Sequence, residues 1–347
     1  MKQIHVYLFA IGCLSILPIL VFLSLYFYKK EQVSYDFKRN IYFKIDSIKP
    51  IDIHFNSYYF AGASGNDLYL GNSTAPFHLL KINSSLADTS SVKIKVNKTD
   101  VKLNGLYTAY TDSIHFYLFN GFERSILKGD IGKWEATPYP IFAPYFTLAI
   151  PLGHQSMAFR IVSTKTGNNS LRKESLPAKT IENETVLEKQ VDGLFCTDGM
   201  LDYNKHIHKI IYTYYYRNQI LLLDTNLKLV TKIKTIDPVD SAKFKVSSIR
   251  SKNSITFSSP PLVVNAKTST WKKYLFVQSK LMGKQEDETL FKTSTVIDIY
   301  DLEKYTYQYS IYLPNYNNYP IRQFKVVNGY IYTLADRYLI RYALQLP

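Results

Sequence analysis

One pattern dominates the chain: a short apolar strand, a polar turn and a second apolar strand recur from residue 67 to the C-terminal region. The clearest copy joins residues 210–214 to residues 220–224. Apolar and polar residues alternate in these segments, which is typical of half-buried β-strands. No helical period of useful length interrupts the pattern, since the best candidate, residues 175–191, contains Pro177 and is predicted to be a long loop. The body is therefore predicted to be all-β.

Six copies of this unit align, and together they predict a β-propeller of six four-stranded blades. Each unit spans roughly 35–75 residues, which is compatible with one blade. A β-sandwich would need fewer strands or a linker between two domains, and a parallel β-helix would show a tighter period. The 30 Tyr and 20 Phe residues agree with this class, because aromatic side chains favour strands. The copies pair residues 67–70 with 79–83, 114–118 with 125–128, 145–150 with 157–162, 210–214 with 220–224, 274–277 with 295–300, and 330–334 with 339–342.

Both ends of this body lack a partner strand. The last copy ends one strand short of four, and residues 42–48 form a strand without a neighbour in the sequence. We expect this N-terminal strand to complete the C-terminal blade, because closure would remove two sheet edges. Lysines at alternate positions, as at Lys93 and Lys95, are expected on outermost strands, where they oppose edge-to-edge aggregation.

Residues 6–28 form an uncharged, apolar run that ends at two lysines. A helix of this length crosses the roughly 30 Å hydrocarbon core of a bilayer. The run also exceeds the apolar core of about 7–15 residues found in a cleavable signal peptide. We therefore predict a single-pass membrane protein with a transmembrane signal-anchor helix in residues 1–30, a linker in residues 31–41 and the propeller in residues 42–347.

The charges that flank this span leave its orientation open, because lysines stand on both sides of it. A signal-anchor with a short N-terminal tail is a common bacterial arrangement, so we expect the body to be periplasmic or otherwise extracytoplasmic. The net charge of +14 is spread through the strands and is not gathered into an arm. Together with a membrane anchor, this distribution argues against a nucleic-acid partner and favours attraction to anionic lipid or to an acidic envelope polymer.

Two segments carry a resemblance to known proteins: GNDLYLGN at residues 65–72 and ILLLDTNL at residues 220–227. With units of this kind, residues 42–347 resemble six-bladed propellers of the broad NHL-like and TolB-like kind, and more closely the uncharacterised membrane-anchored bacterial proteins of that shape. The resemblance implies the fold but assigns no functional residue, because the WD dipeptide, the kelch double glycine and the Tyr-Trp-Thr-Asp signature do not occur in the sequence.

No catalytic motif stands out, since the sequence has no phosphate loop, dinucleotide fingerprint, HExxH, EF-hand loop or GxSxG. The two cysteines, Cys13 and Cys196, provide neither a disulfide framework nor a thiolate metal site. We therefore assign no catalytic residue and no cofactor. The alternative is a metal site of one of two kinds. His206 and His208 are a candidate pair of imidazole ligands, although two ligands need a third. Asp112, Asp198, Asp202 and Asp336, near expected blade ends, are candidate ligands of calcium or magnesium, although Asp serves in turns as well.

Loop residues supply the candidates for a binding surface. Tyr316 and Tyr319 lie in a loop bounded by prolines, and His154 follows an apolar strand near an expected blade end. The predicted function is a non-catalytic, membrane-tethered propeller that binds a protein or a glycan at the cell envelope. The alternative is a metal-assisted hydrolase or lyase with its site at the channel mouth. Three or more converging Asp, Glu or His side chains would favour the alternative, whereas an aromatic mouth without carboxylates would favour binding.

Overall fold

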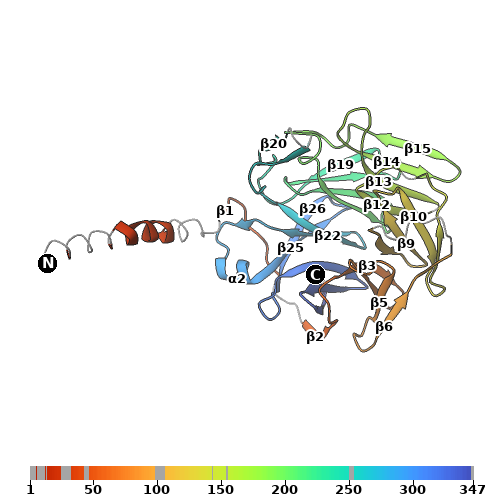
Figure 1. The fold of residues 1–347 in the computed structure, drawn as a ribbon, viewed down its shortest axis with the longest axis horizontal. Coiled ribbons are helices and arrows are strands. Elements are labelled where there is room, and N and C mark those ends of the chain that lie inside the picture. The colour runs from red at the N-terminus through yellow and green to blue at the C-terminus, as the bar shows by residue number, and fades with distance from the viewer. Residues whose placement is uncertain are drawn as a thin grey trace.

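Antiparallel four-stranded sheets make up the body of the protein (Figure 1). The computed structural model describes residues 5, 12, 14–24, 33–42, 47–97, 106–142, 144–153, 155–249 and 254–344. Within each sheet, strands that follow one another in the chain lie side by side. Sheet 1 contains β3 (Tyr58–Ser64), β4 (Asp67–Asn72), β5 (His78–Asn83) and β6 (Thr89–Lys93); sheet 2 contains β8 (Thr108–Thr111), β9 (His115–Asn120), β10 (Ser125–Asp130) and β11 (Glu135–Pro138); sheet 3 contains β12 (Leu148–Gly153), β13 (Ser156–Val162), β14 (Asn169–Ser175) and β15 (Lys179–Asn183). Sheet 4 contains β16 (Gly199–Asn204), β17 (Lys209–Tyr214), β18 (Gln219–Leu223) and β19 (Leu229–Lys234); sheet 5 contains β22 (Asn265–Trp271), β23 (Tyr274–Ser279), β25 (Ser294–Asp301) and β26 (Thr306–Pro314); sheet 6 contains β27 (Ile321–Val327), β28 (Tyr330–Ala335), β29 (Tyr338–Ala343) and β2 (Ser47–Asp52).

In five of the six sheets the two middle strands are the apolar segments that the sequence pattern predicted; in sheet 3 the predicted pair, residues 145–150 and 157–162, corresponds to the inner strand β12 and the middle strand β13. In β9 and β17, for example, every residue after the first is buried. Middle strands are covered on both faces by neighbouring sheets, so they form nearly continuous apolar runs. The all-β prediction is confirmed. The prediction that residues 175–191 form a loop is wrong in part, because the polar, half-exposed outer strand β15 lies within them.

Neighbouring sheets pack face to face, and the alternation of side chains along the middle strands explains how. In β4, Leu68 and Leu70 belong to the same apolar cluster as Leu334 of sheet 6. The intervening Tyr69 packs in the opposite direction, in a cluster with Phe116 of sheet 2. Further clusters join sheets 2 and 3, 3 and 4, 4 and 5, and 5 and 6. Because the last sheet also packs on the first, the sheets form a closed, propeller-like circle.

The first strand of each sheet lies nearest the central axis. Inner strand β3 contacts β8 and β27, and inner strand β22 contacts β16 and β27. Gly62 allows one of these approaches, because a Cβ atom at this position would lie 2.1 Å from the carbonyl oxygen of Thr111. A parallel bridge between the same two residues joins sheets 1 and 2. The inner strands therefore follow one another around the axis.

The outer strand of sheet 6, β2, comes from the N-terminal part of the chain. It pairs antiparallel with β29, and beyond the strand the amide of Ile53 donates a hydrogen bond to the carbonyl oxygen of Arg337 at 2.9 Å. The predicted closure by an N-terminal strand is confirmed. The described strand begins at residue 47 and overlaps the predicted segment, residues 42–48, only at its end, while residues 43–46 lie outside the described residues.

Residues 33–42 pack along sheet 5, and we term them the strap. Residues 33–41 belong to the predicted linker, and residue 42 is the first of the predicted propeller. Its first part, β1 (Ser34–Tyr35), pairs parallel with β24 (Met282–Gly283), which follows β23. Phe37 is buried in an apolar cluster, and Ile41 forms a parallel bridge with β26. The chain therefore enters the body at the β23–β25 connection. The domain boundaries themselves stay a prediction.

A buried ion-pair network fixes the middle of the strap. The side chain of Arg39 is fully buried, with Nε 2.7 Å from Oδ1 of Asp298 and Nη1 2.7 Å from Oε1 of Glu286. Burial by itself lowers the pKa of Arg39, but the charges of Asp298 and Glu286 outweigh it and hold the pKa above its ordinary value. Arg39 is thus charged and doubly paired, which is the arrangement that makes burial of an ion tolerable.

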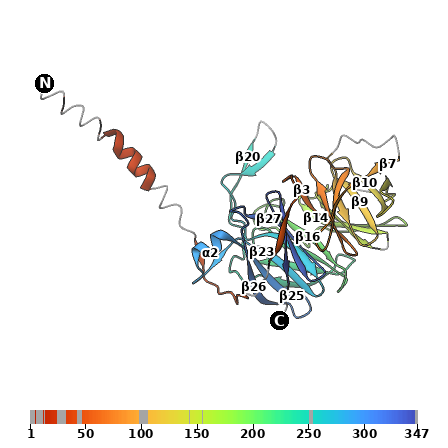
Figure 2. The same cartoon turned by 90° about the horizontal axis from the view of Figure 1, so that it is seen from below.

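Smaller elements lie outside the four-stranded sheets. β7 (Lys95–Val96) pairs with the edge strand β11, and a hairpin of β20 (Val246–Ile249) and β21 (Ser254–Phe257) projects from the body (Figure 2). The helix α2 (Glu288–Thr293) precedes β25, and the side chain of Asp287 caps its first turn.

The N-terminal residues 14–24 are helical, and their apolar side chains are exposed. Figures 1 and 2 show this helix away from the sheets. Within the described parts of the chain, no helix has both the length and the apolar character needed to cross a membrane. The predicted span, residues 6–28, lies partly outside the described residues.

Replacing residues 47–52 with a Gly/Ser segment of equal length should lower the free energy of unfolding by at least about 3 kcal/mol, because β29 loses its partner and the packing of sheet 6 on sheet 1 is weakened. Chemical denaturation measures the loss. A chain that begins at Val33 keeps the strap and β2 and serves as the control. Equal stability of the replaced and control chains would show that closure contributes nothing.

Candidate functional site

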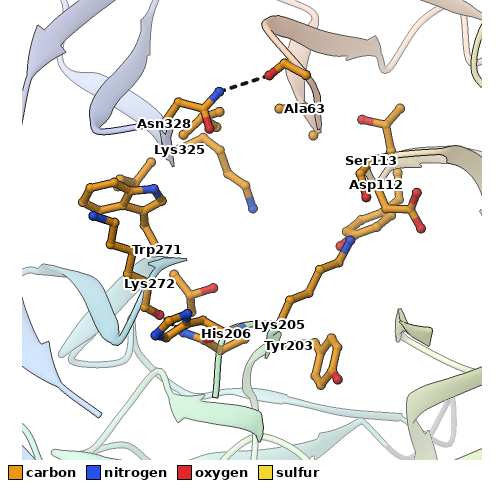
Figure 3. Close-up of a pocket in the computed structure, with 18 residues that line it drawn as sticks. Ala63, Asp112, Ser113, Tyr203, Lys205, His206, Trp271, Lys272, Lys325 and Asn328 are labelled. Carbon is orange, nitrogen blue, oxygen red and sulfur yellow. Dashed lines mark hydrogen bonds between the residues drawn. The ribbon is translucent and has the colours of Figure 1, made fainter. Parts of the chain in front are cut away.

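The turns that follow five inner strands meet at one end of the central axis and surround an opening of about 390 Å³ (Figure 3). These strands are β3, β8, β16, β22 and β27, so side chains from sheets 1, 2, 4, 5 and 6 face a common space. Because each sheet repeats the same meander, the ends of the inner strands gather at the same end of the axis. We term this opening the channel mouth; it is lined by residues 62, 63, 65, 110–113, 203–206, 270–272 and 325–328.

Three lysines at the channel mouth have no ion-pair partner among the described residues, namely Lys205, Lys272 and Lys325. They come from sheets 4, 5 and 6, respectively. Figure 3 shows Lys325 extending into the opening and Lys205 extending towards Asp112 from the other side. Lys272 lies over the ring of Trp271, with Nζ 4.6 Å from the ring centroid, which is a cation–π geometry. The mouth therefore carries excess positive charge.

Asp112 is the one carboxylate among the described residues that line the mouth. Its Oδ1 accepts hydrogen bonds from the amide of Ile114 at 2.8 Å and from the amide of His115 at 2.7 Å. These bonds stabilise the turn between β8 and β9, a common task of Asp in turns. Burial, followed by the charges of Asp112 and Asp202, raises the pKa of Tyr110, so this phenol stays neutral.

A second cavity, of about 550 Å³, opens from the mouth between sheets 2 and 3, and we term it the lateral cleft. Four residues line both cavities, so the two form one continuous surface: Asp112, Ser113, Tyr203 and Lys205. The cleft as a whole is lined by residues 112–115, 117, 128, 139, 151–153, 155, 156, 203, 205 and 208.

Tyrosine rings form much of the wall of the lateral cleft. Nζ of Lys128 lies 5.6 Å from the ring centroid of Tyr117 and 5.1 Å from that of Tyr139. Burial raises the pKa of Tyr117, Tyr139 and Tyr203, so their hydroxyl groups stay protonated at neutral pH. The hydroxyl of Tyr203 lies 3.4 Å from Nδ1 of His208. The cleft thus offers apolar ring faces together with O–H donors.

The structure brings only three of the six candidate metal ligands to this surface. Asp112 and His206 line the mouth, and His208 lines the cleft. Both histidines lie in the turn between β16 and β17. Over the described ranges, no group of three His, Cys, Asp or Glu side chains could hold a metal ion.

The other three candidates lie elsewhere. Asp198 precedes β16 at the opposite end of the axis, where it accepts a hydrogen bond from Arg160. Asp202, within β16, accepts a hydrogen bond from Thr268 of the neighbouring inner strand. Asp336 lies in the turn between β28 and β29, which also faces the opposite end. The candidates therefore do not form one acidic ring.

The aromatic loop candidates also lie away from the mouth. Tyr316 and Tyr319 form a bridge with each other in the connection between β26 and β27, at the opposite end of the axis. Tyr316 packs against Tyr338, with ring centroids 5.0 Å apart, whereas Tyr319 is exposed. His154 lies outside the described residues.

Sequence reasoning missed the lysines of the mouth and Trp271. Lys205 and Lys272 directly follow the inner strands β16 and β22, and Lys325 lies near the end of β27. A signal existed, because each of these residues precedes an apolar middle strand by a few positions. The predicted units contain the middle strands of sheets 4, 5 and 6 but not their inner strands β16, β22 and β27, so the turns that carry these lysines had no assigned place.

Comparisons with known proteins agree with the architecture. No family model matches the chain, and no curated protein matches it. A member of the DUF4221 family from Bacteroides vulgatus is 10% identical, with a TM-score of 0.54 over 89% of this chain and 99% of that chain. A Bacteroides fragilis protein described as a predicted exported protein is 10% identical, with a TM-score of 0.53 over 87% of this chain and 96% of that chain. A streptogramin B lyase is 10% identical, with a TM-score of 0.48 over 87% of this chain and 97% of that chain.

Identities this low concern the fold alone, and the first two structures support a β-propeller fold for this chain. The narrower likeness to NHL-like or TolB-like propellers stays a prediction.

The geometry assigns Asp112 to the β8–β9 turn, and two substitutions test this role. Asp112→Ala should lower the free energy of unfolding by about 1–2 kcal/mol, because two backbone amides lose their acceptor. Asp112→Asn keeps an acceptor oxygen and should retain most of the stability. Denaturation with and without calcium measures both effects. A calcium-dependent stabilisation of the native chain that disappears in both variants would instead identify Asp112 as a metal ligand.

Proposed function

We propose that this chain is a membrane-tethered, six-bladed β-propeller that binds a saccharide in the channel mouth and lateral cleft at the cell envelope. One observation carries the proposal: the mouth and the cleft form a continuous concave surface that combines aromatic rings with hydrogen-bonding groups. Sugar rings present apolar C–H faces and hydroxyl edges, and Trp271, Tyr203 and Tyr117 offer the matching combination.

The concave shape favours a saccharide over a protein partner. Cavities of about 390 and 550 Å³ fall within the usual range of small-ligand sites. A stable protein interface instead buries about 800 Å² on each partner and needs an extended surface. The proposal assigns no cofactor, and the metal-assisted alternative lacks support because no group of three His, Cys, Asp or Glu side chains in the described residues could hold a metal ion.

The tether is consistent with access to this site. The strap enters the body at the β23–β25 connection, whereas the mouth lies at the β22–β23 turn, which is the other end of the same sheet. An N-terminal anchor in residues 6–28 would therefore leave the mouth facing away from the bilayer. A body outside the cytoplasm agrees with the description of the Bacteroides fragilis neighbour as a predicted exported protein.

The tether predicts how the chain distributes between cell fractions. The full chain should sediment with membranes and resist extraction by alkaline carbonate, because residues 6–28 provide enough apolar length to span a bilayer. A chain that begins at Val33 should stay in the supernatant with an unchanged unfolding midpoint. Recovery of the full chain in the supernatant would rule out the tether.

Saccharide binding is tested with a glycan array probed by the chain that begins at Val33. Trp271→Leu and Tyr203→Ala should each weaken binding to any glycan detected by about tenfold or more, because each removes a ring from the site. Tyr319→Ala is the matched control, since this exposed ring lies at the opposite end of the axis. Unfolding midpoints confirm that the variants are folded. Loss of binding only in the Tyr319 variant would place the site at the opposite end.

A further inference from the structure

We infer that the saccharide bound at the channel mouth is anionic and that Lys205, Lys272 and Lys325 hold its charged groups. This inference rests on the proposed function and narrows its ligand class. The groups recognised are carboxylate, sulfate or phosphate substituents on a sugar, which share the property of accepting hydrogen bonds from an ammonium group.

The three lysines of the mouth share one opening, whereas some other lysines of the chain are each paired with a carboxylate. Lys273, the neighbour of Lys272, is paired with Asp301 at 3.0 Å, and Lys81 is paired with Asp67 at 2.9 Å. The lysines of the mouth have no such partner among the described residues. Three ammonium groups from three different sheets thus share one opening, in which Asp112 is the single carboxylate among the described lining residues.

The single acidic group of the mouth does not cancel this charge. Asp112 uses its oxygen to accept hydrogen bonds from two backbone amides, and Nζ of no lysine lies within ion-pair distance of it among the described residues. In a concave opening with walls of low polarizability, the field of several like charges is concentrated on whatever enters. An anion that enters the mouth would relieve the mutual repulsion of the lysines.

Lys128 extends the positive charge into the lateral cleft, where it lies between the rings of Tyr117 and Tyr139. Like the mouth lysines, it has no ion-pair partner among the described residues. A chain of charged sugars that started in the mouth would therefore meet a further cation along the tyrosine wall. This favours an oligosaccharide over an isolated inorganic anion. A lipid headgroup fits less well, because the mouth lies at the end of sheet 5 opposite to the entry of the strap.

The fluorescence of Trp271 can be used to test the charge of the mouth, and this test does not require an identified ligand. Since the chain has two tryptophans, Trp134→Phe leaves Trp271 as the only one. Iodide should quench its fluorescence at least about threefold more efficiently than caesium at low ionic strength, because the lysines concentrate anions near the ring. The triple variant Lys205→Gln, Lys272→Gln and Lys325→Gln should lose this preference.

The control for this experiment carries the same change in net charge. Lys93, Lys95 and Lys234 are exposed on outer strands, and their simultaneous replacement by Gln should leave the iodide preference unchanged. If the Trp134 variant does not fold, the difference in quenching between the native chain and Trp271→Phe gives the same quantity. Equal quenching by iodide and caesium, or an equal effect of the two triple variants, would overturn the inference.

Defined saccharides then separate this inference from the proposed function. Polygalacturonate and heparin oligosaccharides provide carboxylate and sulfate probes, and dextran is the neutral probe. Binding of at least one anionic probe should weaken about tenfold or more between 20 and 300 mM salt, and again in the mouth triple variant but not in the control triple variant. Tighter binding of dextran, unaffected by salt, would overturn the anionic assignment and retain a saccharide function. Binding of none of the three, with the iodide preference intact, would overturn the proposed function and the saccharide assignment with it.

Discussion

The structure depends on the closure of a circle of sheets. Middle strands such as β9 and β17 bury both of their faces, which requires a sheet on either side of them. The first and last sheets obtain that cover from each other, through the cluster that joins Leu68 and Leu70 to Leu334. The pairing of β2 with β29 holds the two ends of the chain together at this interface. Without it, one apolar face and two strand edges would be exposed to water.

The same N-terminal region carries the strap, so ring closure and the attachment of the tether are mechanically linked. Arg39 is buried against two carboxylates, and removing any member of this network would leave a charge without its partner. Such a segment is anchored more firmly than an ordinary linker. The strap therefore fixes where the chain leaves the body, which is at the end of sheet 5 opposite to the channel mouth.

The strands that could be predicted from the sequence are those that are buried on both faces. Middle strands such as β17 are covered on both faces and form long apolar runs, so they could be recognised in the sequence, whereas the more polar β14 could not. Inner strands such as β22 carry mostly small or polar residues, and outer strands such as β15 are polar on their exposed side. Their patterns are too weak to distinguish from loops. The closing strand was predictable because the last unit was incomplete, whereas its register depended on a bulge near Pro50.

The site was harder to predict than the fold. A polar residue beside an inner strand lies at one end of the central axis if it follows the strand and at the other end if it precedes it. Asp112 and Asp198 both lie beside inner strands, yet Asp112 follows its strand and Asp198 precedes its strand, so they face opposite ends. The same geometry gathers Lys205, Lys272 and Lys325, which lie 67 and 53 residues apart in sequence. No local pattern records that convergence, since it follows only from the circular arrangement of the sheets.

The two ends of the axis consequently differ in whether their cationic side chains are paired with carboxylates. At the opposite end, Arg160 is paired with Asp198, and the strap places Arg39 between Asp298 and Glu286. At the channel mouth, cations from three sheets stand beside aromatic rings without such partners among the described residues. Paired charges stabilise the fold, whereas unpaired charges that share a concave opening are available to a ligand. This asymmetry, more than the total charge of the chain, is what directs the assignment of function to the mouth.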